Sequence, residues 1–177
     1  MSTLNVNNIN EAGGVDAVIT SGVLDSGSLP AGSILQVVST TKTDVFSSTS
    51  TSFADITGLS VSITPSSTSS KILVLVDIAS SHSVASGSAY INLLRDSTDI
   101  AQGTGGATLN QTFFFANSQT YEVAHPSTSF LDVPSSTSSL TYKCQVKVAS
   151  GTVYLNRAGH TANLGFVSSI TAMEIAG

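Results

Sequence analysis

Strict alternation of apolar and polar side chains is the feature that most constrains the fold of this chain. From Leu140 to Val148 every second residue is apolar, and threonine, lysine and glutamine fill the positions between. A period of two is typical of a strand with one face in the core and the other in water. No part of the sequence repeats its apolar residues with a convincing helical period, and about ten short strand-like segments recur at spacings of roughly 8–12 residues. We therefore predict an all-β fold, an antiparallel β-sandwich of jelly-roll type.

Two other segments indicate where strands lie within the sheets. The run Lys71–Ile78 is apolar at nearly every position, which is typical of a strand buried on both faces. The last strand-like segment, Ser168–Ile175, carries apolar residues at Ile170, Ala172 and Ile175. We predict that this last segment is an inner strand, paired with a neighbour on each side.

The hexapeptide Pro-Ser-Ser-Thr-Ser-Ser occurs twice, at Pro65–Ser70 and at Pro134–Ser139, and each copy directly precedes a strand-like segment. Proline cannot donate a hydrogen bond to a sheet, and serine and threonine hydroxyls bond to nearby backbone in turns. We predict that each copy is a surface turn that leads into a strand, and that the two turns are equivalent within one sandwich.

Composition excludes several classes of function. Only 10% of the residues are charged and the net charge is −5, with the six basic residues scattered along the chain. Binding to nucleic acid needs a basic patch, so we expect no nucleic-acid partner. No apolar stretch is long enough to span a bilayer and the N-terminus lacks the features of a signal peptide, so we expect neither membrane insertion nor secretion. Cys144, the single cysteine, falls on the apolar phase of its strand and is expected to pack in the core.

Residues 1–31 differ from the rest of the chain, because their apolar side chains are interrupted by glycines. Such a segment is too short to bury these side chains by itself. We predict an extended N-terminal attachment arm at 1–31 and a β-sandwich head domain at 32–177. The apolar arm residues expected to contact another protein are Leu4, Val6, Ile9, Val15, Val18 and Ile19. The alternative is a frayed tail.

The sequence contains no motif of a nucleophilic, metal-dependent or nucleotide-binding enzyme, and we expect no cofactor. Glu122 and Asp132 could form the acid pair of a glycosidase, so a carbohydrate-active enzyme on a sandwich scaffold stays a remote alternative. Phe113, Phe114 and Phe115 are consecutive and must place rings on both faces of a strand. Either two rings lie in the core and one is partly exposed, or the outward ring belongs to a subunit contact.

Several phrases of the sequence resemble small tail-fibre and virion structural proteins of marine tailed bacteriophages. They lie at residues 2–10, 13–16, 32–38, 63–72, 93–98 and 169–175. The resemblance implies a non-enzymatic virion protein, assembled in the host cytoplasm as a homotrimer, whose arm contacts a neighbouring virion protein. Tail fibres usually contain a long repetitive shaft, which this chain lacks. A capsid decoration or cement protein that stabilises the head shell is therefore the alternative.

A host-facing module of this kind would bind through its loops, which are held by a rigid sandwich. Three loops, at 80–88, 103–109 and 157–164, are rich in glycine, serine, threonine and asparagine. We predict that His82, His160 and Asn163 in these loops face a ligand. Because basic residues are few, the expected ligand is a neutral host surface glycan or a protein. The alternative is that the loops are solvated turns without a ligand.

Overall fold

The computed structural model describes residues 19–20, 23–24, 29–105, 111–116, 119–159 and 164–177. Every regular element in these residues is a strand, and all the strand pairs are antiparallel. In chain order the strands are β1 (Ile19–Thr20), β2 (Val23–Leu24), β3 (Ile34–Lys42), β4 (Phe46–Ser48), β5 (Ala54–Ile63), β6 (Lys71–Asp77), β7 (Ser80–His82), β8 (Ser88–Arg95), β9 (Thr98–Ile100), β10 (Phe113–Ala116), β11 (Val123–Ala124), β12 (Ser127–Asp132), β13 (Leu140–Val148), β14 (Val153–Leu155) and β15 (Ser168–Ile175). The predicted all-β antiparallel fold is confirmed.

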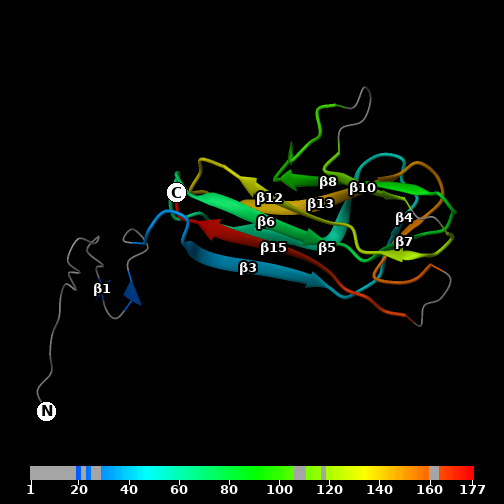
Figure 1. Cartoon of the computed structure of the whole chain (residues 1–177), viewed down its shortest axis with the longest axis horizontal. Helices are drawn as coiled ribbons and strands as arrows, with labels where there is room; N and C mark the ends of the chain where they lie inside the picture. The colour runs from blue at the N-terminus through cyan, green and yellow to red at the C-terminus, as the bar shows by residue number, and fades with distance from the viewer. Residues whose placement is uncertain (1–18, 21–22, 25–28, 106–110, 117–118, 160–163) are drawn as a thin grey trace, which may run out of the picture.

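Two larger sheets form the sandwich (Figure 1). One has the strand order β12-β6-β15-β3 and is called the β15 sheet here, and the other has the order β10-β8-β13-β5 and is called the β13 sheet. In the β13 sheet, β9 also pairs with β8. A third, small sheet of order β11-β7-β14-β4 lies toward one end of the sandwich. As predicted, the last strand, β15, is an inner strand between β6 and β3.

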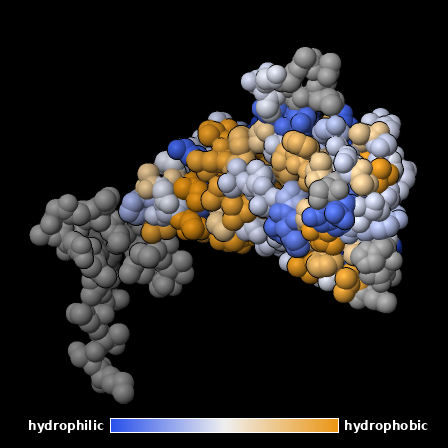
Figure 2. Space-filling model, turned by 45° about the vertical axis from the view of Figure 1, so that its right-hand side comes forward, coloured by the Kyte–Doolittle hydropathy of each residue, from blue (hydrophilic) through white to orange (hydrophobic). Residues whose placement is uncertain are grey.

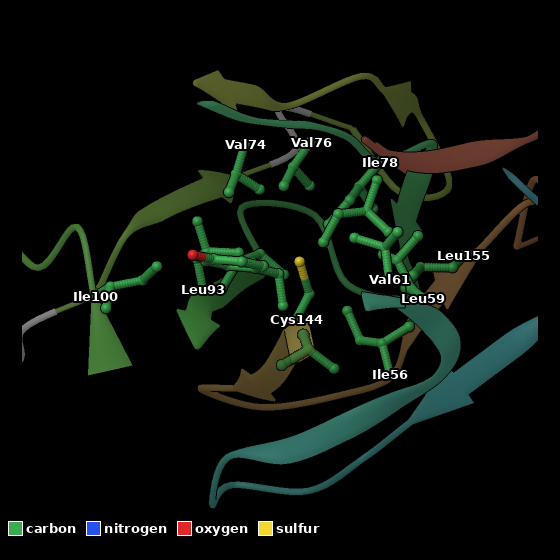
Figure 3. Close-up of a cluster of buried hydrophobic side chains, with 14 of the residues drawn as sticks. Ile56, Leu59, Val61, Val74, Val76, Ile78, Leu93, Ile100, Cys144 and Leu155 are labelled. Carbon is green, nitrogen blue, oxygen red and sulfur yellow. The ribbon is translucent and has the colours of Figure 1, made fainter. Parts of the chain in front are cut away.

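The core lies between the two larger sheets and is filled by the inward residues of both (Figure 3). Strand β13 follows the predicted alternation, because Leu140 to Val148 are buried at every second position. Cys144 is fully buried in this core, and burial raises the pKa of its thiol to about 12. The prediction that this cysteine packs in the core is confirmed.

Both copies of the hexapeptide are turns that connect the two larger sheets. The first leads from β5 to β6 and the second from β12 to β13. The two turns lie at the same end of the sandwich, because Ile63 pairs with Leu140 and Ile72 pairs with Asp132. Each copy leads into a strand, as predicted, but the two differ in structure: the first turns at Thr68 and Ser69 and buries Pro65 and Ser70, whereas the second is an irregular connection with a bend at Ser138.

The two ends of the head domain meet at this same end of the molecule. The Gly32 backbone N–H donates to the Ala176 carbonyl at 2.7 Å, so the start of the head lies beside its C-terminus. Figure 1 shows the chain entering and leaving the sandwich on this side. We call this the arm end, defined by Gly32, Ala176 and the two hexapeptide turns. Of the predicted attachment arm, the strands β1 and β2 pair through Ile19 and Leu24.

Two expectations about strand faces are wrong in detail. Strand β6 was expected to be buried on both faces, but only its inward residues are buried, and Leu73 and Leu75 are half-buried on the outer face. In β15 Ile175 was expected to continue the apolar face of Ile170 and Ala172, but burial alternates without interruption to the end of the strand, so Glu174 is buried and Ile175 is only half-buried. The buried face of β15 therefore ends in a carboxylate. The apolar strand β6 carries Leu73 and Leu75 on an outer face that no layer of the described residues covers fully.

Candidate functional site

The outer face of the β15 sheet is the most distinctive surface of the described residues. Near the arm end, strand pairing sets Val37 beside Met173, Met173 beside Leu73 and Leu73 beside Leu131, which makes an apolar row across all four strands. The next row toward the arm end pairs Ile175 with both Ile34 and Lys71. We call the apolar residues of these two rows the apolar band: Ile34, Val37, Leu73, Leu131, Met173, Ile175 and Val133, which follows β12.

The apolar band is unusually exposed for large side chains. Ile34, Val37, Leu131 and Val133 retain 56%, 54%, 47% and 57% of their accessible surface. Figure 2 shows apolar surface gathered on the head beside the arm end. Soluble monomers rarely expose contiguous apolar patches of more than a few hundred Å², and larger patches mark interaction sites. The band is therefore a candidate protein contact.

The other half of the same sheet face is polar and hollowed. A shallow groove of about 490 Å³ lies there, lined by Leu75, Val76, Asp77, Ser127, Thr128, Ser129, Ser169 and Thr171. Asp77 lies 3.4 Å from His125 Nδ1, and the His125 ring meets Phe166 edge to face. Hydroxyls and one carboxylate can bind a neutral polar ligand or ordered water, and among the described residues no hydroxyl of the groove is hydrogen-bonded to His125.

A buried carboxylate organises the first hexapeptide turn at the arm end. Glu174 is 1% exposed, and its Oε1 accepts hydrogen bonds from the Ser66 backbone N–H, the Ser66 hydroxyl and the Ser70 hydroxyl at 2.6–2.7 Å. Its Oε2 accepts from Gln36 Nε2 at 2.6 Å. Burial by itself raises the pKa of Glu174, but the hydrogen bonds from Ser66, Gln36 and Ser70 outweigh it and hold the pKa below the usual 4.5. The serines of this turn thus donate hydrogen bonds to a buried carboxylate in addition to forming the turn.

A second buried carboxylate lies just before the second hexapeptide turn. Asp132 is 6% exposed, and Arg95 Nη1 donates to both of its oxygens at 2.8–2.9 Å. The hydroxyl of the fully buried Tyr142 donates to Asp132 Oδ2 at 2.7 Å. Burial, together with this carboxylate, raises the pKa of the Tyr142 hydroxyl. Glu174 thus bonds the first hexapeptide directly, whereas Asp132 fixes the end of β12, just before the second hexapeptide, to β8 and β13.

These contacts do not support the proposed acid pair of a glycosidase. Asp132 is engaged with Arg95 and Tyr142 at the arm end of β12. Glu122 is exposed, precedes β11 in the small sheet, and accepts a hydrogen bond from the Gln119 backbone N–H. Asp132 ends β12 at the arm end, whereas Glu122 lies outside any strand, so the hypothesis that the two carboxylates face each other in a sheet is wrong.

The three phenylalanines form strand β10 at the edge of the β13 sheet. Phe115 is buried and Phe113 packs partly against the core, while Phe114 is 57% exposed and stacks on Tyr90 with ring centroids 6.3 Å apart. This arrangement matches the simpler interpretation of two core rings and one outward ring. A subunit contact through Phe114 stays a prediction.

His82 was predicted to face a ligand from a loop, and this prediction is wrong. His82 lies in β7 and is fully buried, and its Nδ1 accepts a hydrogen bond from the Val84 backbone N–H. Burial lowers the pKa of the imidazole, which favours the neutral form. A Cβ at Gly87 would overlap the ring, so this glycine makes the room for a buried histidine.

The remaining predicted site residues cannot be placed. His160 and Asn163 lie outside the described residues, and so do the arm residues Leu4, Val6, Ile9, Val15 and Val18. Ile19 is the first residue of β1. Their predicted roles stay predictions.

Two further searches of the described part of the chain gave negative results. No group of three or more histidine, cysteine, aspartate or glutamate side chains there is arranged to hold a metal ion. None of its elements is a helix long and apolar enough to cross a membrane.

Comparison with known proteins points to a fold rather than a family. No family model matches the chain, and no curated protein matches it. Among solved structures, VP2 of infectious bursal disease virus in a subviral particle is similar over 96% of this chain, with a TM-score of 0.50 and 13% identity. The structure of the Gx strain of the same virus matches 96% of the chain, with a TM-score of 0.49 and 13% identity. This chain spans 38% and 37% of those two chains. The likeness to VP2 in the subviral particle shows a shared β-sandwich fold.

Proposed function

We propose that this chain is a non-enzymatic structural protein of a bacteriophage virion, a homotrimeric tail-fibre-like module whose arm at 1–31 joins it to a neighbouring virion protein. The observation that carries the proposal is the concentration of contact features at one end of the sandwich. This end contains the start of the head and its C-terminus. It also contains the two hexapeptide turns, with a buried carboxylate at or beside each, and the apolar band. A rigid end with an adjacent apolar face suits a protein whose task is assembly.

A low content of charge fits the same role. Only 10% of the residues are charged, whereas a free domain of this size typically carries about 25–35% on its surface. Serine and threonine hydroxyls on the outward strand faces keep the surface wet without ion pairs, whose contribution salt would weaken. Surface that is neither charged nor covered in a single chain is expected to be buried between subunits.

The far end of the head and the polar groove are the surfaces left for a host. We propose that the host contact there is with a neutral surface glycan or a protein, because hydroxyl groups and Asp77 line the groove. Phosphate-rich ligands would need basic side chains, and the residues that line the groove include no lysine or arginine.

A capsid decoration or cement protein is the second candidate. It is favoured by the fold likeness to VP2, a protein seen in a subviral particle. Both candidates predict a virion protein, and they differ in where it sits.

The test is whether the chain is part of the particle at all. Phage particles purified on a density gradient should contain this chain in stoichiometric amount, and an antibody against the head should decorate them. The purified protein should have a mass of about 54 kDa in solution, three times 18.0 kDa. Absence of the chain from infectious particles would overturn the proposal.

A further inference from the structure

We propose that the apolar band is the surface on which a second copy of this chain packs, with the strands of the two copies parallel to the symmetry axis and their arms leaving the same end. The inference rests on the proposed homotrimer and names the face that forms it. It replaces Phe114 as the expected centre of the subunit contact.

The band has the composition of an interface core. Its two rows contain seven apolar side chains and one charge, Lys71, and no acidic residue. A charged protein surface would therefore find almost nothing to pair with here. A second apolar band removes the same side chains from water, and the exposed Lys71, in the row nearest the arm end, can keep its ammonium group in solvent. A second copy of this chain always supplies such a surface.

The apolar band alone is too small for a stable interface, so the polar rows of the same face must also be part of the contact. Four strands about 4.8 Å apart, each with about seven residues of 3.3 Å, give a face of roughly 400 Å² in plan. The band covers about half of it, and a standard interface buries about 800 Å² of accessible surface on each partner. The adjoining row contains Ser39, Thr171, Leu75 and Ser129, which are small or uncharged and can lie at the rim of the contact.

The order of the rows fixes the orientation. From the arm end the face presents the apolar band first, then the row through Thr171, then the row through Ser169 and Asp77. If the second copy ran in the opposite direction, its hydroxyl rows would cover the band. If it runs in the same direction, band meets band and the hydroxyl rows meet each other. When the two faces overlap along their whole length, only the parallel arrangement buries apolar surface against apolar surface, and it also brings the arms together at one end.

This arrangement predicts which strands meet. Rotation about an axis along the strands brings the edge strand β12 of one copy beside the other edge strand, β3, of the next. Leu131 and Val37 occupy the same row at these two edges. Leu131 of one copy should therefore lie near Val37 of the next, in a closed ring of subunits.

The first experiment measures mass in solution for matched variants. We expect Val37→Lys and Leu131→Lys to convert an oligomer of about 54 kDa to a monomer of 18.0 kDa at micromolar concentration, as measured by light scattering. Phe114→Lys is the control, since it places the same charge at an equally exposed apolar residue on the other sheet, and it should leave the oligomer intact. Circular dichroism confirms folding, and Val37→Thr, a smaller polar change, should weaken association in the same direction.

The second experiment tests the orientation. A variant with both Val37→Cys and Leu131→Cys should form disulfides between chains on mild oxidation, and the native Cys144 is buried and should not interfere. The control pair, Val37→Cys with Phe114→Cys, should stay uncross-linked between chains.

The outcomes separate the inference from the function on which it rests. A monomeric wild-type protein overturns both the homotrimer and this interface. An oligomer that survives both lysine variants, or that dissociates only when residues 1–28 are deleted, overturns the interface alone and assigns the contact to another surface or to the arm. An oligomer that dissociates with Phe114→Lys but not with Val37→Lys returns the contact to the β13 sheet.

Discussion

Replacing Glu174 with glutamine should destabilise the head domain, although the two side chains have nearly the same size. The carboxylate accepts three hydrogen bonds at Oε1 and one from Gln36 at Oε2, and it is 1% exposed. In Glu174→Gln, the amide oxygen at the Oε1 position still accepts the hydrogen bonds from Ser66 and Ser70. These bonds are then made to a neutral group and no longer to a charged one. The amide nitrogen then faces Gln36 Nε2, which also donates to the Thr64 carbonyl, so two donors are opposed.

The magnitude follows from the number and kind of these bonds. A hydrogen bond to a charged group contributes about 1.5–3 kcal/mol and a neutral one about 0.5–1.5, so each retained bond loses about 1 kcal/mol. With the lost bond to Gln36, and allowing for non-additivity, we expect the free energy of unfolding to fall by about 3 kcal/mol. For a domain of this size the Tm should fall by about 6–12 °C, measured by calorimetry at pH 7.

The same variant should change how stability depends on pH. The pKa of Glu174 is lowered below 4.5 in the folded state, so its contribution is fully present above the unfolded value and is lost as the pH falls through the folded pKa. Asp44 and Asp55 also have lowered pKa values, but they are exposed and titrate in both proteins. The gap in stability between wild type and Glu174→Gln should therefore narrow below pH 4.5.

Glu122→Gln is the control, because it makes the same chemical change at an exposed carboxylate whose hydrogen bond from the Gln119 backbone N–H an amide oxygen can keep, and it should destabilise the protein much less than Glu174→Gln does. If Glu174→Gln were as stable as the wild type at pH 7, or if the gap stayed constant from pH 7 to pH 3, the account of the buried carboxylate would be wrong.

Three further outcomes follow from burial and close approach. Gly87→Ala should destabilise the head by about 1–3 kcal/mol in urea titration, because the new Cβ would overlap the His82 ring. Gly105→Ala is the control and should be neutral, because a Cβ there meets no described atom within 4 Å. Equal effects of the two substitutions would contradict this packing. Cys144 should not react with a thiol reagent in the native protein at pH 8, since it is buried and its pKa is raised to about 12, and rapid labelling without unfolding would refute this. Deletion of residues 1–28 should leave one cooperative thermal transition, and its loss would show that the arm completes the core.

The strands could be predicted from the sequence where a single face is buried. In β13 the alternation from Leu140 to Val148 continues without interruption, because one face packs on the core and the other carries hydroxyl, amide and amine groups. The two hexapeptide turns were also predictable, since proline and serine restrict the backbone locally. Local chemistry decides both features, so a local pattern is sufficient to find them.

The parts that failed depend on contacts between distant segments. Glu174 is buried because Ser66, Ser70 and Gln36 meet it, more than a hundred residues away in the chain. A signal was present, since Ile170 and Ala172 set a core phase that Glu174 continues, but an apolar Ile175 beside it favoured the other phase.

The candidate contact surface was hidden for a related reason. The run in β6 was interpreted as a strand buried on both faces, and this implied a covering layer. The structure shows that no such layer covers Leu73 and Leu75 fully within one described chain. His82 illustrates the opposite error, because small residues around it were taken for an open loop, whereas Gly87 provides space for a buried ring.

The position of this chain on the intact phage particle tests the central claim most directly. In a density map of the particle by electron cryo-microscopy, the account predicts the sandwich in groups about a symmetry axis parallel to its strands, with the apolar bands facing each other and the arm end against a neighbouring virion protein. Groups on the tail would support the tail-fibre-like module, and groups on the head shell would support the cement protein. Particles without density for the sandwich, or with isolated copies whose apolar bands face solvent, would contradict the account.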